Sequence, residues 1–288
     1  MAARQIKWIL LIVLSLIWGS SFILIKLGLV GLNPLQLGSL RMIFAAVFLL
    51  AIGFRTLPQI PQTKYKYILL TAMLGTFFPA FLFAIAETRI GSSISAMLNS
   101  LTPLNTLVLG GLLFGLNFKR SQIIGVIVGL AGSLLLVFTG TESAAGTDYT
   151  YVFLVYIATV CYGTNVNLIK KYLSDLTPLA ISTGNFTALL GPSLIILYAS
   201  GFLDVVSVAK VQHSVFFIMI LGIAGTGIAN LIFFKLIQIS SPVFATSVTY
   251  LIPIVAFFWG LLDNDMLTPF QFLGAAVILG GVYISGKK

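Results

Sequence analysis

WGSSFILIK (residues 18–26) lies within the first apolar stretch of the chain, and a second copy of its pattern, YGTNVNLIK, occupies residues 162–170. Identical residues recur at an offset of 144 positions, among them Gly19 and Gly163, Lys26 and Lys170, and Pro34 and Pro178. A lysine inside an apolar helix costs roughly 2.5–3.5 kcal/mol on membrane-insertion scales, so two lysines at one offset indicate a tandem duplication. We expect the function to reside where the two halves meet.

The composition is that of an integral membrane protein. Hydrophobic residues make up 59% of the 288 positions, charged residues only 8%, and the mean hydropathy is +1.09, which excludes an ordinary soluble domain. The net charge of +9 comes from basic residues in short loops, where such residues set membrane topology rather than bind nucleic acid. Because Cys161 is the only cysteine, we expect neither an intrachain disulfide nor a metal cluster.

Ten apolar stretches are each close to the ~20 residues that a helix needs to cross the hydrocarbon layer. They occupy residues 7–27, 35–54, 67–86, 92–115, 121–139, 151–171, 178–200, 214–235, 242–262 and 268–286. Four of them begin with an N-cap side chain followed by proline, a typical helix start: Asn33-Pro34, Thr177-Pro178, Ser241-Pro242 and Thr268-Pro269.

Each half of the chain, 1–140 and 151–288, contains five of these stretches. Because five is odd, the second half enters the membrane in the opposite orientation, and such inverted repeats are typical of secondary transporters. The later parts of the halves also correspond once the offset grows by five or six residues: Gly75-Thr76 with Gly225-Thr226, Asn99 with Thr249, and Pro103 with Pro253. The sequence predicts an all-α integral membrane protein whose ten transmembrane helices form two inverted five-helix repeats.

The loops on the two sides of the membrane differ in charge. Twelve basic residues fall on one side: Arg4, Lys7, Arg55, Lys64, Lys66, Lys119, Arg120, Lys170, Lys171, Lys235, Lys287 and Lys288. The other side holds three basic residues, Lys26, Arg89 and Lys210, and six of the seven acids. The positive-inside rule then places both termini in the cytoplasm and the polar linker 141–150 outside.

Charged, polar and aromatic residues inside the apolar stretches are the candidate substrate-binding residues. Arg41 lies seven residues into its stretch, and an intramembrane arginine faces a cavity or a polar partner rather than lipid. The predicted set is Trp18, Ser21, Lys26, Arg41, Phe77, Phe81, Asn99, Tyr162, Asn165, Thr226, Asn230 and Tyr250. Arg41 and Lys26 would bind a carboxylate or phosphate group, and the aromatic side chains would contact the body of a small organic substrate.

Structural roles stay open for several of these residues. Lys170 stands beside Lys171 at a cytoplasmic helix end, where a basic residue can serve to set the membrane topology. Lys26 could instead extend its ammonium group to the membrane interface. Arg41 could instead bond helix-end carbonyls. Buried serine, threonine and asparagine side chains also join helices to one another in membranes.

Proline and glycine mark helices with special geometry. Pro103 and Pro253 are expected to bend their helices, because proline removes a backbone hydrogen bond and clashes with the preceding turn. The glycine-rich stretches 121–139 and 268–286 are expected to pack closely against other helices, because small residues let two backbones approach.

Several motifs together carry a resemblance to a known family. They are WGSSFILIK, the Asn33-Pro34 helix start, Arg41, the Pro103 and Pro253 helices, and DMLTPFQFLGAAVILGGVYI (265–284). On these motifs nearly the whole chain resembles the drug/metabolite transporter superfamily, specifically proteins with two EamA-like domains. Asp265 matches a position that is usually acidic in that repeat ending, whereas Leu116 occupies it in the first copy. The resemblance implies a ten-helix carrier, often an amino-acid or metabolite exporter of a bacterial inner membrane.

The predicted function is ATP-independent secondary transport of small metabolites by alternating access. The sequence contains no Walker-type phosphate loop and no G-x-S-x-G or H-E-x-x-H motif, so we expect no enzyme activity and no cofactor. The expected partners are a small-molecule substrate and the lipid bilayer, with protons as a candidate coupling ion. A passive channel with the same fold is the main alternative, followed by an intramembrane enzyme and an accessory scaffold.

Overall fold

The computed structural model describes residues 3–90, 92–138, 149–262 and 269–287. These residues form helices joined by turns, with no β-strand among them. The first half contains α1 (Ala3–Gly28), α2 (Pro34–Gly53), η1 (Phe54–Gln59), η2 (Gln62–Lys64), α3 (Tyr65–Ala72), η3 (Met73–Phe77), α4 (Phe78–Ala86), α5 (Ser92–Asn99), α6 (Thr102–Phe114) and α7 (Arg120–Phe138). The second half contains α8 (Tyr149–Tyr172), α9 (Pro178–Ala199), α10 (Phe202–Val205), α11 (Ala209–Ile220), η4 (Leu221–Ile228), α12 (Ala229–Ile239), α13 (Pro242–Thr246), α14 (Val248–Leu262) and α15 (Pro269–Ser285).

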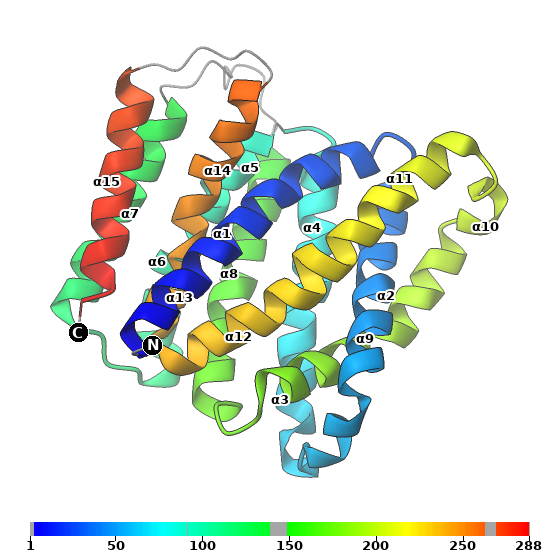
Figure 1. The fold of residues 1–288 in the computed structure, drawn as a ribbon, viewed down its shortest axis with the longest axis horizontal. Helices are drawn as coiled ribbons and strands as arrows, with labels where there is room; N and C mark the ends of the chain where they lie inside the picture. Colours follow the sequence, from blue (N-terminus) through cyan, green and yellow to red (C-terminus); the bar gives the residue numbers. More distant parts are fainter. Residues whose placement is uncertain (1–2, 91, 139–148, 263–268, 288) are drawn as a thin grey trace.

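The helices form one bundle with two faces (Figure 1). We call the face where α1 begins and α15 ends the terminal face, and the other one the distal face. The first helix of the first half, α1, starts at the terminal face, whereas the first helix of the second half, α8, starts at the distal face and ends at the terminal face. The two halves therefore start from opposite faces of the bundle.

Six stretches of the described residues are long and apolar enough to cross a membrane, by length and composition: Gln5–Gly28, Pro34–Gln59, Gln62–Ala86, Tyr149–Tyr172, Pro178–Ala199 and Ala209–Ile239. The other four expected spans contain shorter apolar helices: Thr102–Phe114, Arg120–Leu135, Pro242–Val255 and Phe272–Ser285. Two expected spans are each divided into two helices, 92–115 into α5 and α6, and 242–262 into α13 and α14.

Three of the expected helix starts are confirmed by their capping hydrogen bonds. The Asn33 side chain accepts from the backbone N–H of Gln36 at 2.9 Å, and the Gln36 side chain bonds back to the Asn33 backbone. The Thr177 and Ser241 side chains each accept from the N–H three residues later, at 3.1 Å. Thr268, the fourth predicted cap, lies outside the described residues. These caps satisfy N–H groups that a helix start leaves unpaired.

A helix interruption lies near each of the two prolines, but at a different place in each half. Pro103 stands at the start of α6, directly after the interruption that follows α5. Pro253 lies inside α14, and the interruption in that span comes earlier, at Ser247. A second irregularity is shared by both halves, because η3 and η4 are π-helical segments at corresponding positions. Such segments are often found at functional sites.

Glycine allows the same helix pairing in both repeats. A Cβ atom on Gly19 of α1 would overlap the side chain of Val255 on α14. A Cβ atom on Gly163 of α8 would lie 2.9 Å from the backbone nitrogen of Thr106 on α6 and 3.2 Å from Cβ of Asn105. Since Gly19 corresponds to Gly163 and Val255 to Asn105, the α1–α14 and α8–α6 pairs are equivalent contacts.

Four lysines at the terminal face donate to backbone carbonyls at helix ends. The bonds join Lys7 to Gly286 (2.8 Å), Lys64 to Tyr172 (2.6 Å), Lys170 to Ser240 (2.8 Å) and Lys171 to Phe114 (2.8 Å). A cation at a helix C-terminus satisfies orphan carbonyls and interacts favourably with the helix dipole. Lys64 also lies 2.7 Å from Oδ1 of Asp175, and this hydrogen bond lowers the pKa of the Asp175 carboxyl.

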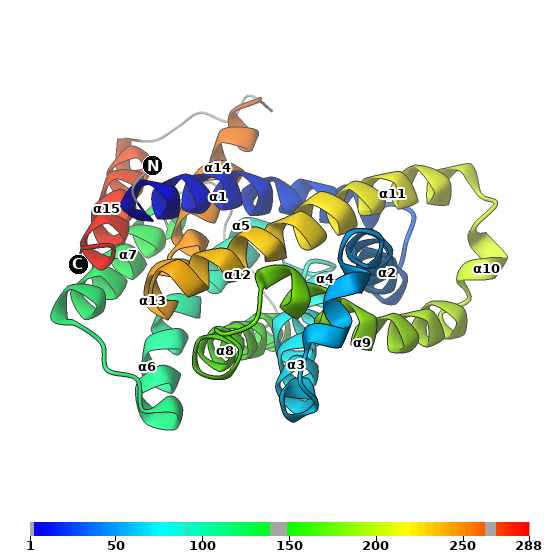
Figure 2. The same ribbon diagram turned by 60° about the horizontal axis from the view of Figure 1, so that its bottom comes forward.

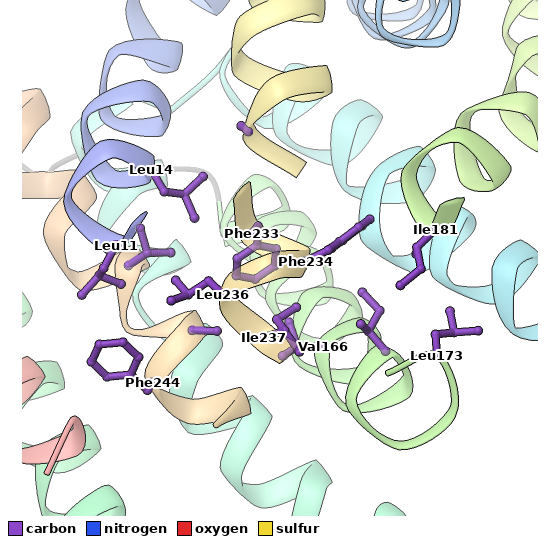
Figure 3. Close-up of a cluster of buried hydrophobic side chains, with 14 of the residues drawn as sticks. Leu11, Leu14, Val166, Leu173, Ile181, Phe233, Phe234, Leu236, Ile237 and Phe244 are labelled. Carbon is purple, nitrogen blue, oxygen red and sulfur yellow. The ribbon is translucent and has the colours of Figure 1, made fainter. Parts of the chain in front are cut away.

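An apolar cluster fills the bundle between its centre and the terminal face (Figure 3). We call five of its buried side chains, from α8 and α12, the terminal plug: Val166, Ile169, Phe234, Leu236 and Ile237. Leu11 and Leu14 of α1 pack into the same cluster and are almost fully buried. Burial of a large aliphatic side chain contributes about 1.5–3 kcal/mol, so this cluster holds α1, α8 and α12 together near the terminal face.

The glycine-rich helices α7 and α15 lie side by side at one end of the bundle (Figures 1 and 2). Their backbones touch, because a Cβ atom on Gly281 would overlap the backbone of Gly129, and a Cβ atom on Gly125 would lie 2.7 Å from the carbonyl oxygen of Gly281. The prediction that these two helices pack closely is confirmed.

Candidate substrate cavity

A cavity lies at the centre of the bundle, where α1, α2, α4 and α5 of the first half meet α8, α12, α13 and α14 of the second. The empty space among its lining residues amounts to about 880 Å³ when solvent-open space is included. Both π-helical segments form part of its wall, through Gly75 and Thr76 of η3 and Gly225 and Thr226 of η4. The cavity therefore lies between the two repeats.

Most of the predicted substrate-binding residues line this cavity. They are Trp18, Ser21, Arg41, Asn99, Tyr162, Asn165, Thr226 and Asn230. Each half of the chain supplies four of them, from helices that are distant in sequence but adjacent at the bundle centre. Repeat-equivalent positions recur in the set, because Trp18 corresponds to Tyr162 and Ser21 to Asn165.

Arg41 is the one charged residue in the described part of the cavity lining. Its Nε atom donates to Oγ1 of Thr226 at 2.6 Å, which joins α2 of the first half to η4 of the second. Among the described residues this is the only hydrogen bond of the guanidinium group, so its Nη donors remain open to an anion. Tyr162 and Glu87 are titratable side chains near the guanidinium group.

Amide and hydroxyl groups surround the arginine. The Oδ1 atom of Asn165 is buried and accepts no hydrogen bond from the described residues, although its side chain lies directly against Gly75. Asn99 Oδ1 accepts from Thr102 Oγ1 at 3.2 Å, and Trp18 Nε1 donates to the carbonyl oxygen of Gly225 at 3.0 Å. A buried acceptor without a partner is costly, so Asn165 provides a site for a donor group of a ligand.

Two aromatic pairs face the cavity from equivalent positions in the repeats. The rings of Trp18 and Phe233 meet edge to face with centroids 4.9 Å apart. The rings of Phe83 and Tyr162 are stacked with centroids 6.1 Å apart. Trp18 corresponds to Tyr162 and Phe233 to Phe83, so each repeat contributes one aromatic residue to each pair. These rings provide flat apolar walls on both sides of the polar groups.

Four predicted residues lie outside the cavity lining: Lys26, Phe77, Phe81 and Tyr250. Lys26 is exposed near the distal end of α1. Tyr250 is buried, but its hydroxyl donates to the carbonyl oxygen of Val126 at 2.9 Å and its ring lies against Gly129, so the side chain is directed towards α7. The hydroxyl needs a buried acceptor, and the α7 backbone supplies one.

Phe77 and Phe81 pack against each other and against α2 instead of facing the cavity. Their ring centroids are 5.1 Å apart, and the Phe81 ring lies so close to Gly38 that a Cβ atom there would approach it to 2.6 Å. The π-helical segment η3 precedes α4 directly. Because a π-turn shifts the angular position of the residues that follow it, regular helical spacing does not predict which side of α4 faces the cavity.

Other residues line the cavity although they are not in the predicted substrate-binding set: Phe22, Phe83, Thr102, Phe233, Thr246 and Thr249. A signal for two of them was present in the sequence, since Phe83 and Phe233 are identical residues at the offset of 150 positions that relates Gly75 to Gly225. Thr102, Thr246 and Thr249 belong to polar stripes beside Pro103 and Pro253, and such stripes also occur in helix contacts that bind nothing.

The described residues include no group of three or more histidine, cysteine, aspartate or glutamate side chains that could hold a metal ion. What the cavity offers is one cation, several hydrogen-bonding groups and aromatic walls within a bundle of long apolar helices. That combination, between two halves that start from opposite faces, defines a multi-pass membrane transport protein.

The comparisons with known proteins identify the family. The pattern of the EamA-like transporter family matches the chain twice, over residues 6–138 and 149–286. The chain therefore belongs to the EamA-like transporter family of the drug/metabolite transporter superfamily. The family resemblance carried by the sequence motifs is confirmed.

Similar proteins carry transporter names. A protein of Escherichia coli (strain K12) named "Probable amino-acid metabolite efflux pump" is 27% identical over 288 residues, which cover 96% of this chain and 93% of that protein. The inner membrane transporter YedA of the same strain is 27% identical over 281 residues, covering 95% and 88%. A solved crystal structure at 16% identity has a TM-score of 0.75 and covers 99% of this chain and 96% of its own, which supports the fold alone.

Proposed function

We propose that this protein is a secondary exporter of small metabolites that works by alternating access in a bacterial inner membrane. The observation that carries the proposal is the polar cavity between two repeats that start from opposite faces. Such a pair of repeats lets one central site open to each side of the membrane in turn. Ten membrane crossings, with the terminal face in the cytoplasm, belong to the same proposal.

The two faces of the cavity differ in a way that supports this mechanism. The buried side chains of the terminal plug lie on α8 and α12, between the cavity residues Asn165 and Phe233 and the ends of these helices at the terminal face. Towards the distal face, the lining extends to Ile25, only three residues before the end of α1. We infer that this conformation is closed on the terminal side, which is one of the two states that an alternating-access cycle requires.

The lining favours a substrate with a carboxylate, a donor group and an apolar body. Arg41 presents a planar fork suited to a carboxylate, and Asn165 Oδ1 can accept a hydrogen bond from an ammonium or amide group. The aromatic walls suit an apolar side chain. An amino acid or a related metabolite combines these features, and the name of the E. coli relative supports the same class.

Transport in liposomes tests the function directly. The purified protein is reconstituted and screened for uptake of labelled amino acids, nucleosides and organic anions. We expect saturable uptake of an amino-acid-like compound. Unlabelled compound on the opposite side of the membrane should accelerate this uptake, because the binding site of a carrier must return to the first side after each transport step and can do so with substrate bound. Uptake that never saturates and shows no such exchange would identify a passive channel. An imposed pH gradient in the same liposomes tests protons as the coupling ion.

The proposed orientation has its own test. In a Cys161→Ser background, Tyr149→Cys at the distal face and Lys287→Cys at the terminal face each provide one exposed thiol. We expect an impermeant maleimide to label intact cells at position 149 only, because the positive-inside rule places the lysine-rich terminal face in the cytoplasm. Labelling at position 287 in intact cells, with protection at position 149, would reverse the orientation.

A further inference from the structure

Lys26 and Lys170 occupy the same place in the two repeats, but their surroundings differ. Lys170 Nζ donates to three carbonyl oxygens at the end of α12, those of Ile237 at 3.1 Å, Gln238 at 3.3 Å and Ser240 at 2.8 Å. Lys26 is exposed near the distal end of α1 and has no hydrogen-bond or ion-pair partner among the described residues. The duplicated lysine is therefore bonded at one face and unbonded at the other.

The repeat correspondence identifies the carbonyls that match those bound by Lys170. Over residues 75–103 the first half is offset from the second by 150 positions, so the end of α12 corresponds to the turn that follows α4. The matching carbonyls are those of Glu87, Thr88 and Ile90. This turn lies at the distal end of α4, and Lys26 lies at the distal end of α1, so donor and acceptors belong to the same face of the bundle.

The helix pairs that would carry the two lysine contacts are packed differently in this structure. Val166 of α8 belongs to the terminal plug and is fully buried outside the cavity lining. Its repeat equivalent, Phe22 of α1, lines the cavity and meets Phe83 of α4 with ring centroids 6.4 Å apart. The α8–α12 pair therefore closes the terminal side, whereas the equivalent α1–α4 pair borders the cavity on the distal side.

We propose that Lys26 and Lys170 are a pair of gate residues that bind helix ends in turn. In the conformation described here, Lys170 holds the end of α12 and the terminal side is closed. In the opposite conformation, Lys26 binds the carbonyls of Glu87, Thr88 and Ile90, which closes the distal side, and Lys170 leaves α12. The proposal rests on the alternating-access function and assigns the residues that hold each end shut.

The exchange has a clear physical basis. An ammonium group at the last carbonyls of a helix makes charge-assisted hydrogen bonds and interacts favourably with the helix dipole. Because each lysine finds three equivalent acceptors when its own side closes, the set of bonds lost at one face is regained at the other. The two conformations then differ little in free energy, as a carrier requires.

Distances between spin labels at both ends of α1 and α8 report the conformation. In a Cys161→Ser background, one pair of labels at Val30 and Tyr149 reports the distal face, and a pair at Gln5 and Ser174 reports the terminal face. All four residues are exposed. We expect Lys170→Met to shift the population roughly tenfold towards the longer terminal and shorter distal distance, because a charged hydrogen-bond set is lost from one state. Lys26→Met should shift it the other way.

Lys171→Met is the matched control. Lys171 also bonds a helix-end carbonyl, that of Phe114 on α6, but the α8–α6 pair is closely packed and so is its repeat equivalent, α1–α14. This contact is therefore not exchanged, and its loss should leave the distances unchanged. Lys170→Arg keeps the positive charge and should retain most of the wild-type distribution. Melting temperatures in detergent verify that each variant is folded.

The outcomes separate the gate from the transport function. Opposite shifts for Lys26→Met and Lys170→Met, with none for Lys171→Met, support the proposal. If the wild type populates two states but neither variant changes their ratio, the gate assignment is overturned while alternating access stands. If the wild type has one set of distances under all conditions and shows no exchange transport, both the gate and the proposed function are overturned.

Discussion

Replacing Arg41 by lysine is expected to lower substrate uptake by roughly 10- to 100-fold, the range for losing one good charge-assisted interaction. Lysine keeps the positive charge but not the planar fork, and it cannot donate to Thr226 and to a substrate carboxylate in the same geometry. Uptake and detergent melting temperature are measured on the same purified variant. If Arg41 binds substrate, uptake falls while the melting temperature changes little.

The Thr226→Val variant distinguishes substrate binding by Arg41 from a structural role of Arg41 in joining α2 to η4. It removes the acceptor of the 2.6 Å hydrogen bond from Arg41 Nε but leaves the whole guanidinium group in the cavity. If Arg41 acts mainly as a brace between α2 and η4, both Thr226→Val and Arg41→Lys should lower the melting temperature together with uptake. If Arg41 binds substrate, Thr226→Val should retain far more uptake than Arg41→Lys. Unchanged uptake and stability in Arg41→Lys would exclude both roles.

Gly281→Leu is expected to destabilise the protein strongly, whereas Gly280→Leu should be nearly neutral. At position 281 a Cβ atom would overlap the backbone of Gly129, while at position 280 nothing lies within 4 Å. A side chain added against backbone cannot be relieved by a rotamer change, so the cost should reach or exceed the ~1–3 kcal/mol typical of overpacking. The two leucines have the same helix propensity and hydrophobicity, so the difference between the variants isolates the contact.

The melting temperature and the monodisperse peak in detergent chromatography measure this effect. The expected result is a clearly lower melting temperature or loss of the peak for Gly281→Leu, with Gly280→Leu close to the wild type. Equal behaviour of the two variants would contradict the backbone contact between α7 and α15. Transport by Gly280→Leu serves as a check that the open space beside Gly280 on α15 takes no part in the mechanism.

Much of the fold was predictable because membrane insertion leaves a clear sequence pattern. Apolar length, the caps at Asn33, Thr177 and Ser241, and the duplicated motif around Lys26 and Lys170 are local or nearly local signals. The same is true of Arg41, since a charge inside an apolar stretch has few stable places other than a cavity. The central position of most binding candidates followed from the repeat, which predicts a junction between the halves.

The positions of individual side chains around that junction depended on tertiary structure. Phe77 and Phe81 lie outside the cavity lining, where a π-helical segment precedes α4 and shifts the helix phase. Tyr250 also lies outside it, because its hydroxyl donates to a backbone carbonyl on α7. The lysine-bound helix ends at the terminal face were not foreseen either, since the positive-inside rule gives the side of a charge but not its partner.

Hydropathy and repeat offsets are properties of the chain alone, so the membrane class, the duplication and Arg41 as a charged candidate could be derived from the residues themselves. The packing of the folded bundle, in contrast, leaves Lys170 bonded and Lys26 exposed. Two identical residues in equivalent repeats carry the same local information, so any difference between them arises from how the halves pack. In this conformation the halves meet tightly at the terminal face, and that asymmetry exists only in the folded bundle.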